Sequence, residues 1–202
     1  MALLPGFSGL KNTPTYDASG TITTGGTAQR ILPFQPTRSY LLVQNTSSAN
    51  LYLGIGGATA TATISSGVVN SITVANGGLG YTYPPIVQFF GGGTVNAQLG
   101  DALGSPWGNA PAVPAQAKAN LTSNAVSSIT ILNGGSGYLV APFVYLQPDP
   151  RDPYGAFAPS ATAGIVLQPG LGYVAESSVV TNDPVSIFGA TTGQSFVCKF
   201  IV

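Results

Sequence analysis

The stretch ATATISSGVVNSITVANGGLGYTYPPIVQF, residues 60–89, recurs 57 positions later as AKANLTSNAVSSITILNGGSGYLVAPFVYL, residues 117–146. The two segments align without a gap, and 14 of their 30 positions are identical. This self-similarity indicates an internal duplication. We therefore predict two copies of one unit, the repeats covering about 60–116 and 117–160.

Apolar and polar residues alternate within each copy. Ile72 and Val74 alternate with Ser71 and Thr73, and residues 128–131 repeat the pattern. Period two is typical of a half-buried strand. We therefore expect a strand at this point of each copy, preceded by a strand with the pattern A-x-A-x-[IL].

The motif N-G-G-x-G-Y follows this strand in both copies. Asn and Gly adopt the positive φ angles of tight turns, so the motif predicts the turn of a repeated hairpin. The return strand begins after Pro85 or Pro142, where a missing N–H can face away from the ladder. The residues assigned a structural role in the two turns are Asn76, Gly77, Gly78, Gly80, Asn133, Gly134, Gly135 and Gly137.

Two glycine-rich segments have compositions that also occur in ligand-binding loops. A phosphate loop needs a following helix and a nearby Lys, whereas Tyr81 and two prolines follow the first N-G-G-x-G. The segment GIGGATA, residues 54–60, has Thr59 where the dinucleotide-binding spacing requires glycine, and no βαβ pattern surrounds it. We therefore predict neither a phosphate site nor a bound cofactor.

The flanking segments predict further strands. In residues 38–56, Tyr40–Val43 is a predicted strand, NTSSAN a polar turn and Leu51–Leu53 the return strand. The predicted strands of the C-terminal segment are Val179–Val180, Val185–Phe188 and Phe196–Val202.

Neither flank has enough strands for a two-layer core alone. We predict an all-β protein in which residues 15–59 and 165–202 form a discontinuous β-sandwich. Residues 60–164 would be an inserted β-repeat domain, because insertions are tolerated where both ends meet at a surface loop. Residues 1–14 would be an N-terminal arm.

The charge content is unusually low. Only 6% of the 202 residues are charged, six basic and six acidic, against about 25% in ordinary domains. Soluble monomers normally keep a charged surface, so we expect a polar uncharged surface that is partly covered by partners in a larger assembly. The few scattered Lys and Arg argue against nucleic-acid binding. The sequence contains no run of eighteen apolar residues, so we do not predict a membrane span.

The sequence contains few residues that could act in catalysis. The chain has no His, and its acids are Asp17, Asp101, Asp149, Asp152, Glu176 and Asp183. Two acids brought together could serve a glycosidase, and Asp149 with Asp152 could hold calcium, although a solvated proline-rich loop with a local ion pair to Arg151 is favoured. Cys198 is expected to be a small buried hydrophobe. We predict no catalytic, cofactor or metal site.

The aromatic residues raise the question of carbohydrate binding, because sugars stack on exposed rings. Trp107, in the segment GSPWGNAP at 104–111, is the candidate residue for such a contact. A lone Trp in a long loop could equally anchor a subunit interface.

The repeats resemble a family of sequences. SITVANGGLGYTYPPIVQF and SITILNGGSGYLVAPFVYL resemble the SI-x-V-x-NGGSGYT-x-x-P-x-V repeats of structural proteins of tailed bacteriophages. Residues 38–56 and 172–200 resemble a small β-domain of phage virion proteins, in which R-x-x-L-x-x-Q-N-x-S opens a hairpin and G-Q-x-F/V-x-C/V-x closes the chain. The resemblance implies a virion component with no catalytic residues.

From this resemblance and the low charge, we expect a structural protein of a phage virion, assembled in the host cytoplasm. A capsid decoration or cement protein that binds the major capsid protein, with a homotrimer favoured, is the first expectation. A tail, collar or fibre protein with a receptor- or carbohydrate-binding surface, such as one for a host-surface glycan, is the alternative. A carbohydrate-binding module or weak polysaccharide hydrolase is the third.

Overall fold

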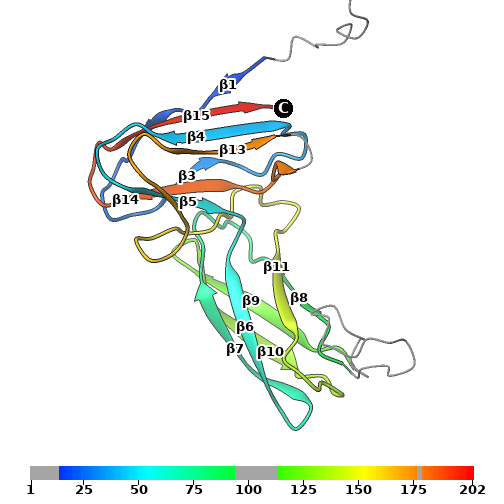
Figure 1. The fold of residues 1–202 in the computed structure, drawn as a ribbon. Helices are drawn as coiled ribbons and strands as arrows, with labels where there is room; N and C mark the ends of the chain where they lie inside the picture. The colour runs from blue at the N-terminus through cyan, green and yellow to red at the C-terminus, as the bar shows by residue number, and fades with distance from the viewer. Residues whose placement is uncertain (1–13, 94–112, 177–178) are drawn as a thin grey trace, which may run out of the picture.

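The computed structural model describes residues 14–93, 113–176 and 179–202 (Figure 1). The regular structure of these residues consists of β-strands, which confirms the all-β prediction. Within the described ranges, no helix is long and apolar enough to cross a membrane. The strands are β1 (Tyr16–Asp17), β2 (Gly20–Thr21), β3 (Gln29–Leu32), β4 (Tyr40–Asn45), β5 (Leu51–Ile55), β6 (Thr59–Ser65), β7 (Val68–Asn76), β8 (Ile86–Phe90), β9 (Gln116–Thr122), β10 (Ala125–Asn133), β11 (Phe143–Gln147), β12 (Ile165–Leu167), β13 (Gly172–Glu176), β14 (Val185–Gly189) and β15 (Ser195–Ile201).

Strands from both ends of the chain form two antiparallel sheets that pack face to face. One sheet has the order β1-β15-β4-β13, with β2 also paired to β15, and the other has the order β12-β5-β14-β3. The inward residues of both sheets build one apolar core. It comprises Ile22, Leu32, Leu41, Val43, Leu51, Leu53, Leu167, Val185, Ile187, Phe196 and Cys198. We call this part the sandwich.

The segment NTSSAN is not the turn of a hairpin. Strand β4 pairs with β15 and β13, whereas β5 lies in the opposite sheet and pairs with β14 and β12. The expected pairing of these two strands is therefore wrong, and the segment crosses between the sheets. The fully buried Asn45 amide stabilises the crossing, because it donates to the carbonyls of Ala49 and Leu167 at 2.8 and 2.7 Å.

The two sequence repeats form a second unit, which projects from the sandwich (Figure 1). We call it the repeat unit. In each copy the first two strands form a hairpin, β6 with β7 and β9 with β10. The third strands are exchanged, because β11 of the second copy pairs with β6 of the first and also with β8. Strand β8 in turn lies against β9, and β10 lies against β7.

The predicted position of the repeat hairpins is wrong. N-G-G-x-G-Y connects β7 to β8 and β10 to β11, and neither pair of strands shares a ladder. The hairpin turns lie earlier, at Ser66–Gly67 and Ser123–Asn124, where all four residues have positive φ. The physical reason is the exchange of third strands, since β8 and β11 find their partners outside their own hairpins.

The core of the repeat unit is duplicated residue by residue. Every one of its members has a counterpart 57 positions away that also belongs to the core. The pairs are Ala58/Ala115, Ala60/Ala117, Ala62/Ala119, Ile64/Leu121, Val69/Val126, Ile72/Ile129, Val74/Ile131, Tyr81/Tyr138, Val87/Val144 and Phe89/Leu146. The two copies therefore share one apolar interior with approximate two-fold symmetry, and neither copy buries its apolar face alone.

The strand predicted at Val179–Val180 is not observed. Val179 lies outside the strands, and 72% of its surface is exposed. The strand in this region is β13, which ends at Glu176. Its inward Ala175 is buried and its neighbour Val174 is exposed, so burial alternates along β13. Because the exposed Val174 is also apolar, the sequence does not show this alternation.

Candidate functional site

Each N-G-G-x-G-Y loop binds the hairpin of the other copy. The carbonyl of Gly77 accepts a hydrogen bond from the backbone N–H of Val126 at 2.8 Å, and Gly134 accepts one from Val69 at 2.9 Å. A Cβ atom added at Gly77 or Gly134 would lie 2.6 Å from the carbonyl oxygen of Val126 or Val69, respectively. Glycine is therefore required at both positions by the close approach of the two copies.

The remaining residues of the motif shape the loop. Positive φ angles occur at Gly78, Gly80, Gly135 and Gly137, where glycine carries no steric cost. The carboxamide oxygens of Asn76 and Asn133 accept hydrogen bonds from the N–H groups two residues on, each at 2.8 Å. The side chains and backbone of both loops are thus used in internal bonds and in contacts between the copies.

The tyrosine of each motif is buried and bonded to its own repeat. Tyr81 and Tyr138 are each 2% exposed. The phenol oxygen of Tyr81 accepts a hydrogen bond from the N–H of Ala58 at 2.6 Å, and that of Tyr138 accepts one from Ala115 at 2.8 Å. Burial raises the pKa of Tyr81, so its hydroxyl stays protonated.

The segment from residue 148 to 158, which we call the connector, joins the first of these loops to the sandwich. Leu79 and Ala156 exchange backbone hydrogen bonds at 2.8 and 2.9 Å. On the sandwich side, the N–H of Phe34 donates to the carbonyl of Pro153 at 3.0 Å. The Arg30 guanidinium donates to the Tyr154 carbonyl at 2.9 Å and lies 4.6 Å from the centre of its ring. The connector is therefore bonded to both units.

The acids of the connector differ from the expected solvated loop. The expected ion pair is present, since Asp149 and Arg151 are 2.7 Å apart. The hydrogen bond from Arg151 lowers the pKa of Asp149 to about 2. Asp152, however, is only 2% exposed. Its carboxylate accepts hydrogen bonds from the N–H groups of Thr82, Tyr83 and Tyr154 at 2.7, 2.9 and 3.1 Å, so the expectation of a solvated Asp152 is wrong.

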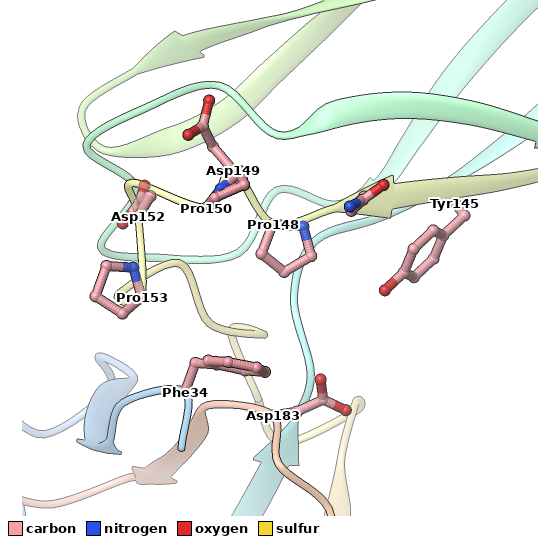
Figure 2. Close-up of a pocket in the computed structure, with 9 residues that line it drawn as sticks. Phe34, Tyr145, Pro148, Asp149, Pro150, Asp152, Pro153 and Asp183 are labelled. Carbon is pink, nitrogen blue, oxygen red and sulfur yellow. The ribbon is translucent and has the colours of Figure 1, made fainter. Parts of the chain in front are cut away.

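A hollow of about 370 Å³ lies between the connector, strand β11 and the sandwich (Figure 2). Phe34 and Asp183 of the sandwich form one side, and Tyr145 of β11 lies on the other, with three prolines of the connector around them. Gln147 of β11 also lines the hollow. Phe34 and Tyr145 are 39% and 41% exposed. The size is within the range of small-ligand sites, about 300–1,000 Å³.

The hollow brings together three of the predicted acids. Asp149, Asp152 and Asp183 all line it, but Asp149 is paired with Arg151 and Asp152 accepts three backbone hydrogen bonds. Among the residues that the structure describes, no cluster of three or more metal-binding side chains occurs. The sequence did not indicate Phe34 or Asp183 as partners of Tyr145, because their proximity depends on how the two units meet.

A buried arginine fixes one side of the hollow. Arg38 is 5% exposed and donates 2.9 Å hydrogen bonds to the carbonyls of Pro33, Thr181 and Asp183. Burial lowers its pKa, although nearby Asp183 favours the charged form. One guanidinium thus ties the backbone beside Phe34 to the backbone of Asp183.

A second surface feature is the side of the sandwich where β12 and β13 lie. In the described part of the chain, β12 pairs only with β5 and β13 only with β4, so both are edge strands. Ile165, Val166 and Val174 are 42%, 51% and 52% exposed. Glu176 is the one charged residue within these two strands.

Trp107 and Asp101 lie outside the described residues. No protein-family model matches the chain, and neither curated proteins nor solved structures gave a match.

Proposed function

We propose that the chain is a structural component of a tailed-phage virion, and within it a capsid decoration protein that stabilises the assembled head. The observation that carries this proposal is the edge formed by β12 and β13, in which Glu176 is the one charged residue. We call it the open edge. The sequence repeats, which resemble those of phage structural proteins, support the assignment to a phage virion.

The open edge carries little of the charge that usually protects the sheet edges of a soluble monomer. Exposed edge strands offer free backbone N–H and C=O groups, and soluble proteins normally shield them with charges, proline or a covering segment. Here Val166 and Val174 are half exposed, and only Glu176 at the end of β13 carries charge. An edge of this kind is suited to a permanent contact with another subunit.

The proposed mechanism is mass action on an assembled surface. A protein that contacts several neighbouring capsid subunits binds the closed shell more strongly than it binds free subunits. Its binding free energy is then added to the stability of the shell. A homotrimer placed at threefold positions of the capsid would multiply these contacts by symmetry. The N-terminal arm, residues 1–14, is proposed to bind the shell as well.

The test uses particles that lack the chain. Heads purified from a deletion strain are mixed with recombinant protein, and bound protein is measured after sedimentation. Wild type is expected to saturate the heads, whereas Val166→Lys and Val174→Lys should each reduce binding at least tenfold, because each places a charge in a contact that excludes water. Leu132→Lys is the control, since Leu132 is 65% exposed in the repeat unit, away from the open edge.

Two results would oppose the proposal. Wild-type protein that fails to bind the heads would contradict the decoration role. Equal loss with Leu132→Lys and with the open-edge variants would show that the open edge is not the contact. Deletion of residues 1–15 tests the arm separately, and unchanged occupancy after that deletion would remove the arm from the mechanism.

A further inference from the structure

We infer that the hollow between the connector, β11 and the sandwich binds a neutral saccharide of one or two pyranose rings. This inference goes beyond the structural role proposed above and does not depend on it. A head protein and a tail protein could each carry such a site.

The walls of the hollow supply two aromatic rings. Phe34 comes from the sandwich and Tyr145 from β11, and both rings face the space between the two units (Figure 2). They remain 39% and 41% exposed although they stand beside a concave surface. Pyranose rings have faces of C–H groups that pack on aromatic rings, so this arrangement gives a sugar apolar contact on two sides.

The polar groups supply one donor and one acceptor. The carboxamide oxygen of Gln147 accepts a hydrogen bond from the Gln88 side chain at 2.6 Å. No group in the described part of the chain accepts from the Gln147 N–H₂ group, so it can donate to a ligand. One carboxylate oxygen of Asp183 accepts from the Thr181 hydroxyl at 2.9 Å. No described group bonds its other oxygen. Sugar hydroxyls both donate and accept, so neighbouring hydroxyls of one ring can bond to Gln147 and Asp183 together.

The charges of the hollow disfavour other ligands. No Lys or Arg is among its lining residues, which argues against a phosphate or another anion. Asp149 is bonded to Arg151 and its carboxylate points away from Phe34 and Asp183 (Figure 2). The carboxylate of Asp152 is occupied by backbone N–H groups. One carboxylate is too few for a calcium site, which takes six to eight oxygens.

The site is held in place before any ligand binds. Arg38 ties the carbonyl of Pro33 to that of Asp183, and Phe34 is bonded through its own N–H to Pro153. Pro148, Pro150 and Pro153 restrict the backbone around the opening. Ligand binding therefore orders few additional groups, which favours affinity for a small neutral ligand.

The experiment uses the full chain labelled with ¹⁵N. Glucose, galactose, N-acetylglucosamine, maltose and N,N′-diacetylchitobiose are each titrated and followed by chemical-shift changes. At least one of these sugars is expected to bind with millimolar or better affinity and to shift the amides of Phe34, Tyr145 and Asp183. Tyr145→Ala and Phe34→Ala should each weaken binding at least tenfold, and Asp183→Asn at least threefold.

The control is Tyr16→Ala, because Tyr16 is 44% exposed on the sandwich, away from the hollow. It should leave the affinity within twofold of wild type. Tyr145 and Phe34 are partly exposed, and two-dimensional spectra of each variant verify that the fold is kept. The absence of shifts with all five sugars would overturn the inference. Tighter binding of lysine, N-acetylneuraminic acid or Ca²⁺ at these amides would also overturn it.

Discussion

Tyr81 and Tyr138 occupy equivalent positions 57 residues apart and make the same hydrogen bond. Each phenol oxygen accepts from the backbone N–H that leads into the first strand of its own repeat, at Ala58 or Ala115. Both side chains are 2% exposed and belong to one shared core. The pair shows that the duplicated motif makes equivalent contacts in the two halves of a single unit.

Removal of either phenol oxygen should destabilise the repeat unit. Tyr81→Phe and Tyr138→Phe each leave a buried N–H without its acceptor, which costs about 1–3 kcal/mol. The measurement is the free energy of unfolding by urea titration. Tyr16→Phe is the control, since Tyr16 is 44% exposed and its ring centre lies 5.3 Å from that of Phe200 in a stacked arrangement. This stacking does not involve the hydroxyl group. A change of less than 0.5 kcal/mol in the free energy of unfolding of both core variants would mean that these hydrogen bonds do not contribute to stability.

The two motif asparagines should differ in importance. Asn76 bonds the N–H of Gly78 and, in addition, donates to the Ala158 carbonyl at 2.8 Å and accepts from its N–H at 3.2 Å. Asn133 makes only the bond to Gly135 among the described residues. Asn76→Ala is therefore expected to cost about 1–2 kcal/mol more than Asn133→Ala, because two further bonds to the connector are lost. Thermal and urea unfolding of both variants check this difference, and equal losses would refute the bond to the connector.

Gly155 should not tolerate a side chain. A Cβ atom at this position would lie 2.1 Å from the Tyr81 ring. Gly155→Ala is expected to lower the free energy of unfolding by about 1–3 kcal/mol, because the ring or the connector must move. Gly20→Ala is the matched control, since its Cβ would meet the Phe196 ring at an ordinary 3.5 Å. Similar stabilities for the two variants would show that the connector is not packed on Tyr81 as described.

Cys198 should be unreactive in the folded protein. It is fully buried in the sandwich core, and burial raises the pKa of its thiol to about 12. The reactive species is the thiolate, so a thiol reagent such as dithionitrobenzoate at pH 8 should label native protein only as fast as it unfolds. In strong denaturant one thiol per chain should react at once. Rapid labelling of the native protein would contradict the described packing of β15.

Part of this fold is readable from the sequence because it depends on local pattern. The duplication is visible by alignment, and the alternation at Ser71–Val74 identifies β7. Segments that cross between sheets are harder to predict from sequence, since a polar stretch such as NTSSAN is compatible both with a hairpin turn and with a crossing between sheets. The pairings of β4 and β5 and the partners of Asn45, which include Leu167, distinguish the two.

The rest of the fold depends on strand pairings between residues that are far apart in the sequence. The β11 strand of the second copy pairs with β6 of the first, and period two is the same whichever strand becomes the neighbour. The hollow has the same origin, because Phe34, Tyr145 and Asp183 are far apart in sequence and meet only where the units join. Asp152 was expected in solvent because proline-rich loops are usually exposed, and its bonds to Thr82 and Tyr83 could not be inferred from spacing.

The central proposal, a decoration protein of a phage head, is tested most directly by counting copies. Under this proposal a phage encodes the chain, and its purified particles contain the protein. The abundance of the chain relative to the major capsid protein is measured by quantitative mass spectrometry with isotope-labelled peptides. A decoration protein that follows capsid symmetry should be present in hundreds of copies per particle. A few copies per particle, or none, would contradict the proposal.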